Sequence, residues 1–147
     1  MKMSKKSYSK IVDKASPPSP IFKNCTAAFF IGGFICVLGE LLTKLYAEIG
    51  AGHQQIKMLV PVTLIFLAAF LTAIKLFDNI GKFAGAGTLV PITGFANAVT
   101  SAAIEFKTEG FILGLGAKMF TIAGPVIVYG TVASVVYGVI YWFTTLF

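Results

Sequence analysis

GAGTLVPITGFANAVTSAAIEFKTEG, residues 85–110, lies between two strongly apolar stretches of the chain. Its glycines and its proline oppose a continuous helix, because proline lacks a backbone donor and clashes with the preceding turn. We therefore predict a helix break at Gly85, Gly87, Pro91 and Gly94. After this break, a helix is expected from about residue 93 or 94 to residue 106.

The predicted helix carries a polar face, which we call the polar row: Thr93, Asn97, Thr100, Ser101 and Glu105. Inside a membrane, polar groups persist only where they are buried in protein or line a wet cavity. They either bond to neighbouring helices, each bond contributing less than about 2 kcal/mol, or line a path for a polar solute. Four of them in register beside a helix break favour the path.

The composition indicates a membrane protein. Of the 147 residues, 56% are hydrophobic and only 12% are charged, whereas soluble domains carry about 25% charged residues. We expect an all-α integral membrane protein in which residues 25–147 form a single polytopic domain. About four membrane segments are expected, at residues 26–46, 58–77, 83–106 and 110–145.

The last segment is too long for one straight crossing. A helix of about 38 residues would extend roughly 57 Å, nearly twice the hydrocarbon thickness. We predict a break at Gly124 and Pro125, which separates a shorter helix at about 110–122 from a full span at about 125–145. Whether the shorter helix crosses or re-enters is left open, and so is the side of the C-terminus.

Broken helices expose backbone donors at their N-terminal ends, which attract anions. Candidate anion sites are therefore Thr93 with Gly94, and the helix start near Gly124 and Pro125. Lys118 could add a positive charge to such a site or pair with Glu105 or Glu109. No metal site or cofactor is expected, because the single histidine, His53, has no second ligand at metal spacing.

Two further patterns concern helix contacts. Glu40 and Lys44 lie four residues apart, so they can form an ion pair on one helix face. Gly130, Ser134 and Gly138 also recur every four residues, and such a stripe of small residues allows another helix to approach closely.

The N-terminal residues 1–24 form a separate basic segment. Six lysines precede the first apolar stretch, the chain has no arginine, and the formal net charge is +6. Cationic residues beside a first span favour a cytoplasmic N-terminus. We expect a flexible cytoplasmic arm and not a nucleic-acid site, because the bidentate arginine contacts of such sites are missing. An enzyme is not expected.

Residues 85–130, and above all VPITGFANA and AGPVI, resemble the core of the stage V sporulation protein AC family. The sister protein AE is similar over this region, but the N-terminal arm and the first hairpin favour AC. The resemblance covers nearly the whole chain. It supplies no catalytic residues.

The resemblance implies a place in the inner membrane of a bacterial spore. Proteins of this family, with companions that include AD and AE, move dipicolinic acid, usually with calcium, into the developing spore and out at germination. A tension-sensitive channel is also implied. Two alternatives stay open: a non-conducting scaffold subunit of a multiprotein membrane complex, and a proton-coupled carrier.

Overall fold

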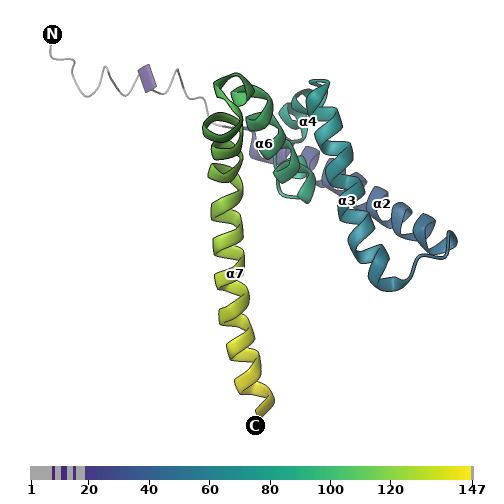
Figure 1. Ribbon diagram of the computed structural model, residues 1–147. Coiled ribbons are helices and arrows are strands. Elements are labelled where there is room, and N and C mark those ends of the chain that lie inside the picture. The colour runs from purple at the N-terminus through teal and green to yellow at the C-terminus, as the bar shows by residue number, and fades with distance from the viewer. Residues whose placement is uncertain (1–7, 9–10, 13–14, 16–18, 147) are drawn as a thin grey trace.

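The computed structural model describes residues 8, 11, 12, 15 and 19–146. Most of the predicted flexible arm, residues 1–24, lies outside these described residues. The described part is helical and contains no strand, which confirms the all-α class. Its elements are α2 (Ile21–Glu48), α3 (His53–Ala73), α4 (Phe77–Ala84), α5 (Ala86–Leu89), α6 (Ile92–Glu105), the 3₁₀-helix η1 (Phe106–Glu109), the π-helical η2 (Phe111–Gly116) and α7 (Ala117–Leu146) (Figure 1).

Three stretches of the described chain are long and apolar enough to cross a membrane: residues 21–48, 53–73 and 111–146. The predicted count of four segments is therefore not confirmed. The predicted span at 83–106 is not one helix. It contains the last residues of α4, all of α5 and all of α6. With 14 residues, α6 extends only about 21 Å, which is too short to cross the hydrocarbon core alone.

The first two spans form an antiparallel hairpin (Figure 1). Between the end of α2 and the middle of α3, the hydroxyls of Tyr46 and Thr63 lie 2.6 Å apart. Thr63 already donates its proton to the Leu59 carbonyl at 2.9 Å, so Tyr46 is the donor between the two side chains. This bond fixes the register of α2 against α3.

The predicted break at Gly124 and Pro125 is wrong. Helix α7 runs without interruption from Ala117 to Leu146 and contains Pro125 in its interior. A proline removes one backbone hydrogen bond, and a helix of this length retains the others. The interruption lies earlier, at Gly110, whose φ of +103° is a left-handed value that favours glycine.

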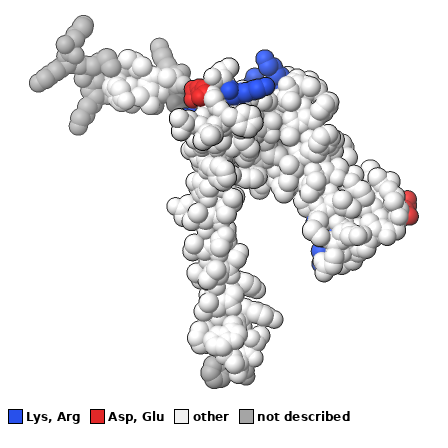
Figure 2. All heavy atoms as spheres, viewed as in Figure 1, with Lys and Arg blue, Asp and Glu red and all other residues white. Residues whose placement is uncertain are grey.

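The small core lies where α3, α4 and α6 meet. Ala68, Phe77 and Ala96 are buried there, and Leu71 packs against them. Helix α7 contacts α6 and η2 at its beginning, and none of its described residues is buried. In Figure 2 it extends as a separate column, with an open space between it and the α2–α3 hairpin.

Candidate functional site

The broken segment comprises residues 77–105, with α4, α5 and α6. Its first turn, between α4 and α5, lies at Gly85, which has a φ of +51°. This turn directs α5 across the start of α2. A Cβ atom added to Gly87 would lie 2.5 Å from the carbonyl oxygen of Ala28. The two backbones are therefore in contact, and only glycine fits at this crossing.

The start of α6 is closed by the preceding part of the chain. Thr88 is 1% exposed, and its carbonyl accepts a hydrogen bond from the Thr93 hydroxyl at 3.4 Å. A Cβ atom on Gly94 would collide with the Leu89 backbone. The backbone of Thr88 and Leu89 therefore lies against the start of α6, and the anion site expected at Thr93 and Gly94 stays a prediction.

The middle of the polar row contacts α3. The Thr72 hydroxyl lies 2.8 Å from the Asn97 side-chain oxygen and 2.7 Å from the Ala68 carbonyl oxygen. One hydroxyl proton serves only one of these acceptors at a time. Since Thr72 is 7% exposed, Asn97 here has a structural contact within its own chain.

The C-terminal end of the polar row is more open. Thr100 and Ser101 are half-buried, as Asn97 is, and Glu105 at the end of the row is exposed. Ser101 donates to the Asn97 carbonyl of its own helix at 2.7 Å. Among the described residues, Glu105 has no cationic partner within 4.0 Å. The contacts divide the row: Thr93 and Asn97 lie within hydrogen-bond distance of other segments of the chain, whereas Thr100, Ser101 and Glu105 have no such partner outside α6 among the described residues, and we call them the open end.

Lys118 does not pair with Glu105 or Glu109. Its amino group lies 4.4 Å from the centre of the Phe106 ring, an arrangement that favours a cation–π contact. Gly114 packs closely against the backbone of the same turn, because an added Cβ atom would lie 2.6 Å from the Phe106 carbonyl oxygen. Lys118 therefore fixes the start of α7 against η1.

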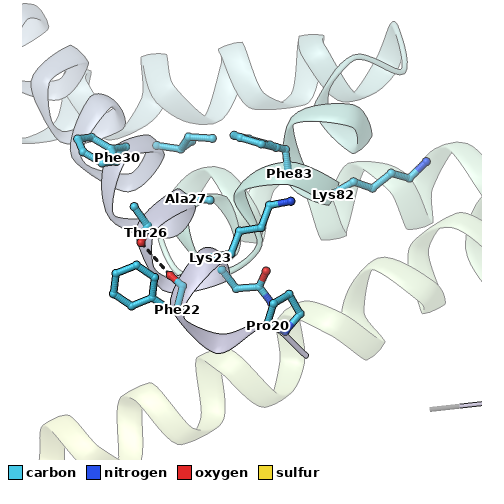
Figure 3. Close-up of a pocket in the computed structure, with 10 residues that line it drawn as sticks. Pro20, Phe22, Lys23, Thr26, Ala27, Phe30, Lys82 and Phe83 are labelled. Carbon is cyan, nitrogen blue, oxygen red and sulfur yellow. Dashed lines mark hydrogen bonds between the residues drawn. The ribbon is translucent and has the colours of Figure 1, made fainter. Parts of the chain in front are cut away.

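Sequence reasoning missed several polar residues that the fold brings together. Thr72 and Thr88 are buried partners of the polar row, and no local pattern indicates which helix they face. A cavity of about 710 Å³ also lies between α2 and α4, lined in part by Lys23 and Lys82 (Figure 3). The sequence places both lysines beside apolar stretches, but it does not show that they are neighbours.

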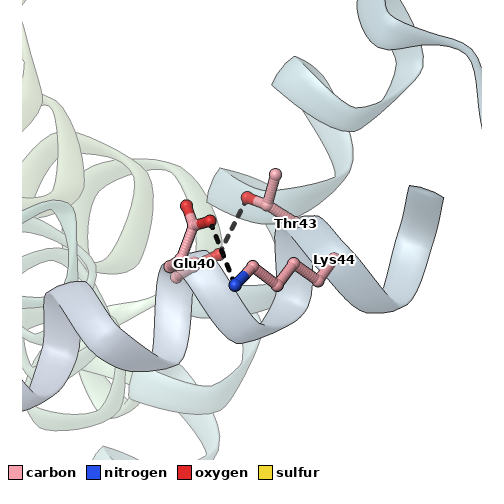
Figure 4. A network of polar contacts seen from close by, with 4 residues as sticks. Glu40, Thr43 and Lys44 are labelled. Carbon is pink, nitrogen blue, oxygen red and sulfur yellow. Dashed lines mark hydrogen bonds and ion pairs between the residues drawn. The ribbon is translucent and has the colours of Figure 1, made fainter. Parts of the chain in front are cut away.

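Glu40 and Lys44 form the predicted ion pair, with a separation of 4.0 Å (Figure 4). Their side chains are 65% and 71% exposed, respectively. Thr43, between them, donates to the Gly39 carbonyl at 2.9 Å. The pair therefore lies on the outer surface of α2, away from the polar row.

The stripe on α7 meets no other element of the described chain. No atom lies within 4 Å of a Cβ added to Gly130 or Gly138, and Ser134 donates to the Gly130 carbonyl at 2.8 Å. Helix packing through this stripe stays a prediction. Because no helix begins at Gly124 and Pro125, the anion site expected there is wrong.

Comparison with known proteins gives a consistent result. Residues 24–140 match the family model of the SpoVAC/SpoVAEB sporulation membrane proteins. The chain is also similar to the stage V sporulation protein AC of Bacillus subtilis (strain 168), with 43% identity over 142 residues, which cover 92% of this chain and 91% of that protein. No solved structure matches the chain significantly.

Proposed function

The chain belongs to the SpoVAC/SpoVAEB family of sporulation membrane proteins, and we propose that it is a channel or transport subunit for dipicolinic acid. It moves this aromatic dicarboxylate, with calcium, across the inner membrane of the spore during sporulation and germination. The observation that carries the proposal is the open end of the polar row, which belongs to a broken segment that packs against two long apolar helices.

The open end supplies the chemistry of a polar path. Thr100 and Ser101 offer hydroxyls, and exposed Glu105 offers a carboxylate that attracts a cation such as calcium. Polar groups of this kind at membrane depth require a wet cavity or protein neighbours. A path through the membrane needs walls on all sides, so other subunits complete it. We propose that these include the stage V sporulation proteins AD and AE.

The distribution of lysines supports a cytoplasmic N-terminus. Lys23, Lys75 and Lys82 lie at the start of α2, at the end of α3 and on α4, which are neighbouring parts of the fold. The five further lysines of residues 1–14 precede them, and cationic residues concentrate on the cytoplasmic side. With three crossings, the C-terminus then lies on the opposite side of the membrane from the N-terminus.

Gating by membrane tension forms part of the proposal. Residues 111–146 form a stretch of 36 helical residues, about 54 Å long, which exceeds the hydrocarbon thickness of about 30 Å. Such a helix tilts or bends to match the bilayer, and membrane thinning under tension changes that match. Because α7 begins against α6, its tilt is transmitted directly to the broken segment.

A test in spores uses Glu105→Gln and Thr100→Val, which alter the open end and spare the Thr72–Asn97 contact. We expect release of dipicolinic acid at germination to slow by about 5- to 30-fold, equivalent to about 1–2 kcal/mol in the barrier. Co-purification with the partner proteins should be unchanged. Glu109→Gln is the matched control, because Glu109 is also exposed but lies on η1 outside the row.

A non-conducting scaffold predicts a different result. In that case the two variants release dipicolinic acid at the normal rate, or they lose release only together with assembly. Either outcome contradicts a role of this subunit in lining the path.

A further inference from the structure

The cavity between α2 and α4 has two kinds of wall. Phe22 and Phe30 of α2 and Phe83 of α4 contribute aromatic rings, while Lys23 and Lys82 contribute cationic side chains (Figure 3). A second cavity of about 270 Å³ is also lined by Lys82 and Phe83, and it extends towards Gly85. The two neighbouring cavities share Asn24, Lys82 and Phe83, and together, as what we call the recess, they extend from the start of α2 to the turn of the broken segment.

The lysines of this recess form no ion pair within the described part of the protein. Neither Lys23 nor Lys82 has a carboxylate within 4.0 Å among those residues. Lys23 extends along the recess towards α4, whereas the amino group of Lys82 points outward from it (Figure 3). The four-carbon stem of a lysine lies on apolar surface while its ammonium group reaches a polar layer. The two amino groups thus mark the polar rim of the recess.

The aromatic side of the recess is exposed. Phe22 is 87% exposed and Phe30 is 68% exposed, although both belong to a helix apolar enough to cross the membrane. Phe22 lies beside Lys23 in the first turn of α2, whereas Phe30 lies seven residues further along the helix, towards the apolar layer. An occupant must therefore carry negative charge at one end and a long apolar part at the other.

We propose that this recess binds one anionic phospholipid. Its phosphate accepts hydrogen bonds from the ammonium group of Lys23 and, once the Lys82 side chain rotates inward, from that of Lys82, and an acyl chain runs past Phe22 to cover Phe30. Basic pockets between helices on the cytoplasmic side of membranes suit such headgroups. A small dicarboxylate would neutralise the lysines but is too short to reach from Lys23 to Phe30, which lie seven residues, or about 10 Å, apart along α2. The bound lipid joins the start of α2 to α4 and so fixes the beginning of the broken segment against α2.

Native mass spectrometry of the full-length protein in detergent, titrated with phosphatidylglycerol or phosphatidylcholine, tests this proposal. The wild type should retain phosphatidylglycerol preferentially. Each of Lys23→Gln and Lys82→Gln should weaken its binding about fivefold, and the double variant about 30-fold, because one lysine near an anionic lipid contributes about 1 kcal/mol. Lys107→Gln, an equal change of charge on η1 outside the recess, should leave binding unchanged.

Two further arms exclude a folding defect and a different ligand. The double variant Lys23→Arg, Lys82→Arg keeps both charges and should retain phosphatidylglycerol. Dipicolinate in excess should not displace the lipid. Equal binding of the two lipids, an equal loss in Lys107→Gln, loss in the arginine variant or displacement by dipicolinate would each overturn the proposal.

Discussion

The broken segment and helix α7 use the same small and hydroxylated residues in opposite ways. In the broken segment, Gly87 contacts the backbone of Ala28, and the carbonyl of buried Thr88 accepts a bond from Thr93. In α7, Gly130 and Gly138 have open space around them, and Ser134 bonds only to its own helix. A pattern of small residues therefore permits close helix approach, but it does not say whether the partner is the same chain or another one.

The largest expected contrast is between two Gly→Ala variants. Gly87→Ala places a Cβ atom 2.5 Å from a backbone oxygen, and overpacking of this kind costs about 3 kcal/mol. A Cβ atom added at Gly130 has no neighbour within 4 Å, so Gly130→Ala should raise the free energy of unfolding by up to about 1 kcal/mol through helix propensity. The free energy of unfolding of the isolated protein in mixed detergent micelles, followed by circular dichroism, measures both. Equal effects would remove the distinction between the two regions.

A smaller effect is expected for the contact that joins the polar row to α3. Thr72→Val and Asn97→Ala should show a coupling energy of about 0.6–1.7 kcal/mol in a double-mutant cycle, the range for hydrogen bonds between membrane helices. Ser134→Ala on α7 is the control for loss of a hydroxyl, because its bond stays within one helix. Additive effects of Thr72→Val and Asn97→Ala would show that the polar row is not bonded to α3.

The smallest predicted change in unfolding free energy is at Lys75, which lies between the end of α3 and the start of α4. Lys75 has a φ of +61°, a left-handed value that costs a non-glycine residue about 1–2 kcal/mol. Lys75→Gly removes this strain but adds backbone entropy in the unfolded chain, so the net gain in unfolding free energy is about 0.5 kcal/mol. Lys75→Ala loses the same charge without relieving the strain, and it should show no gain. An equal gain in both variants would contradict this explanation.

The sequence predicted those features that local backbone chemistry determines. The helix expected from residue 93 or 94 to 106 corresponds to α6, and Pro91 with Gly85 marks breaks in the structure. The Glu40–Lys44 pair follows from helical spacing alone. In each case, residues within one turn of each other carry the information.

The predictions that were wrong concern features that depend on tertiary contacts or on the backbone hydrogen bonds of a complete helix. Pro125 removes one hydrogen bond, and continuity of α7 depends on all the other bonds of that helix. Lys118 contacts the Phe106 ring and not Glu105 or Glu109, because the turn at Gly110 places that ring beside it. Likewise, the pairing of Asn97 with Thr72 spans 25 residues, so no local spacing could identify it.

Cysteine labelling along the broken segment tests the central claim most directly. With Cys25 and Cys36, both exposed, replaced by alanine, single cysteines are placed at residues 88, 93, 100, 101 and 105 and treated with a membrane-impermeant maleimide in membranes that contain the partner proteins. We expect labelling at positions 100, 101 and 105 and protection at positions 88 and 93. Protection at all three positions of the open end, in resting and in germinating spores, would contradict a water-filled path along the polar row.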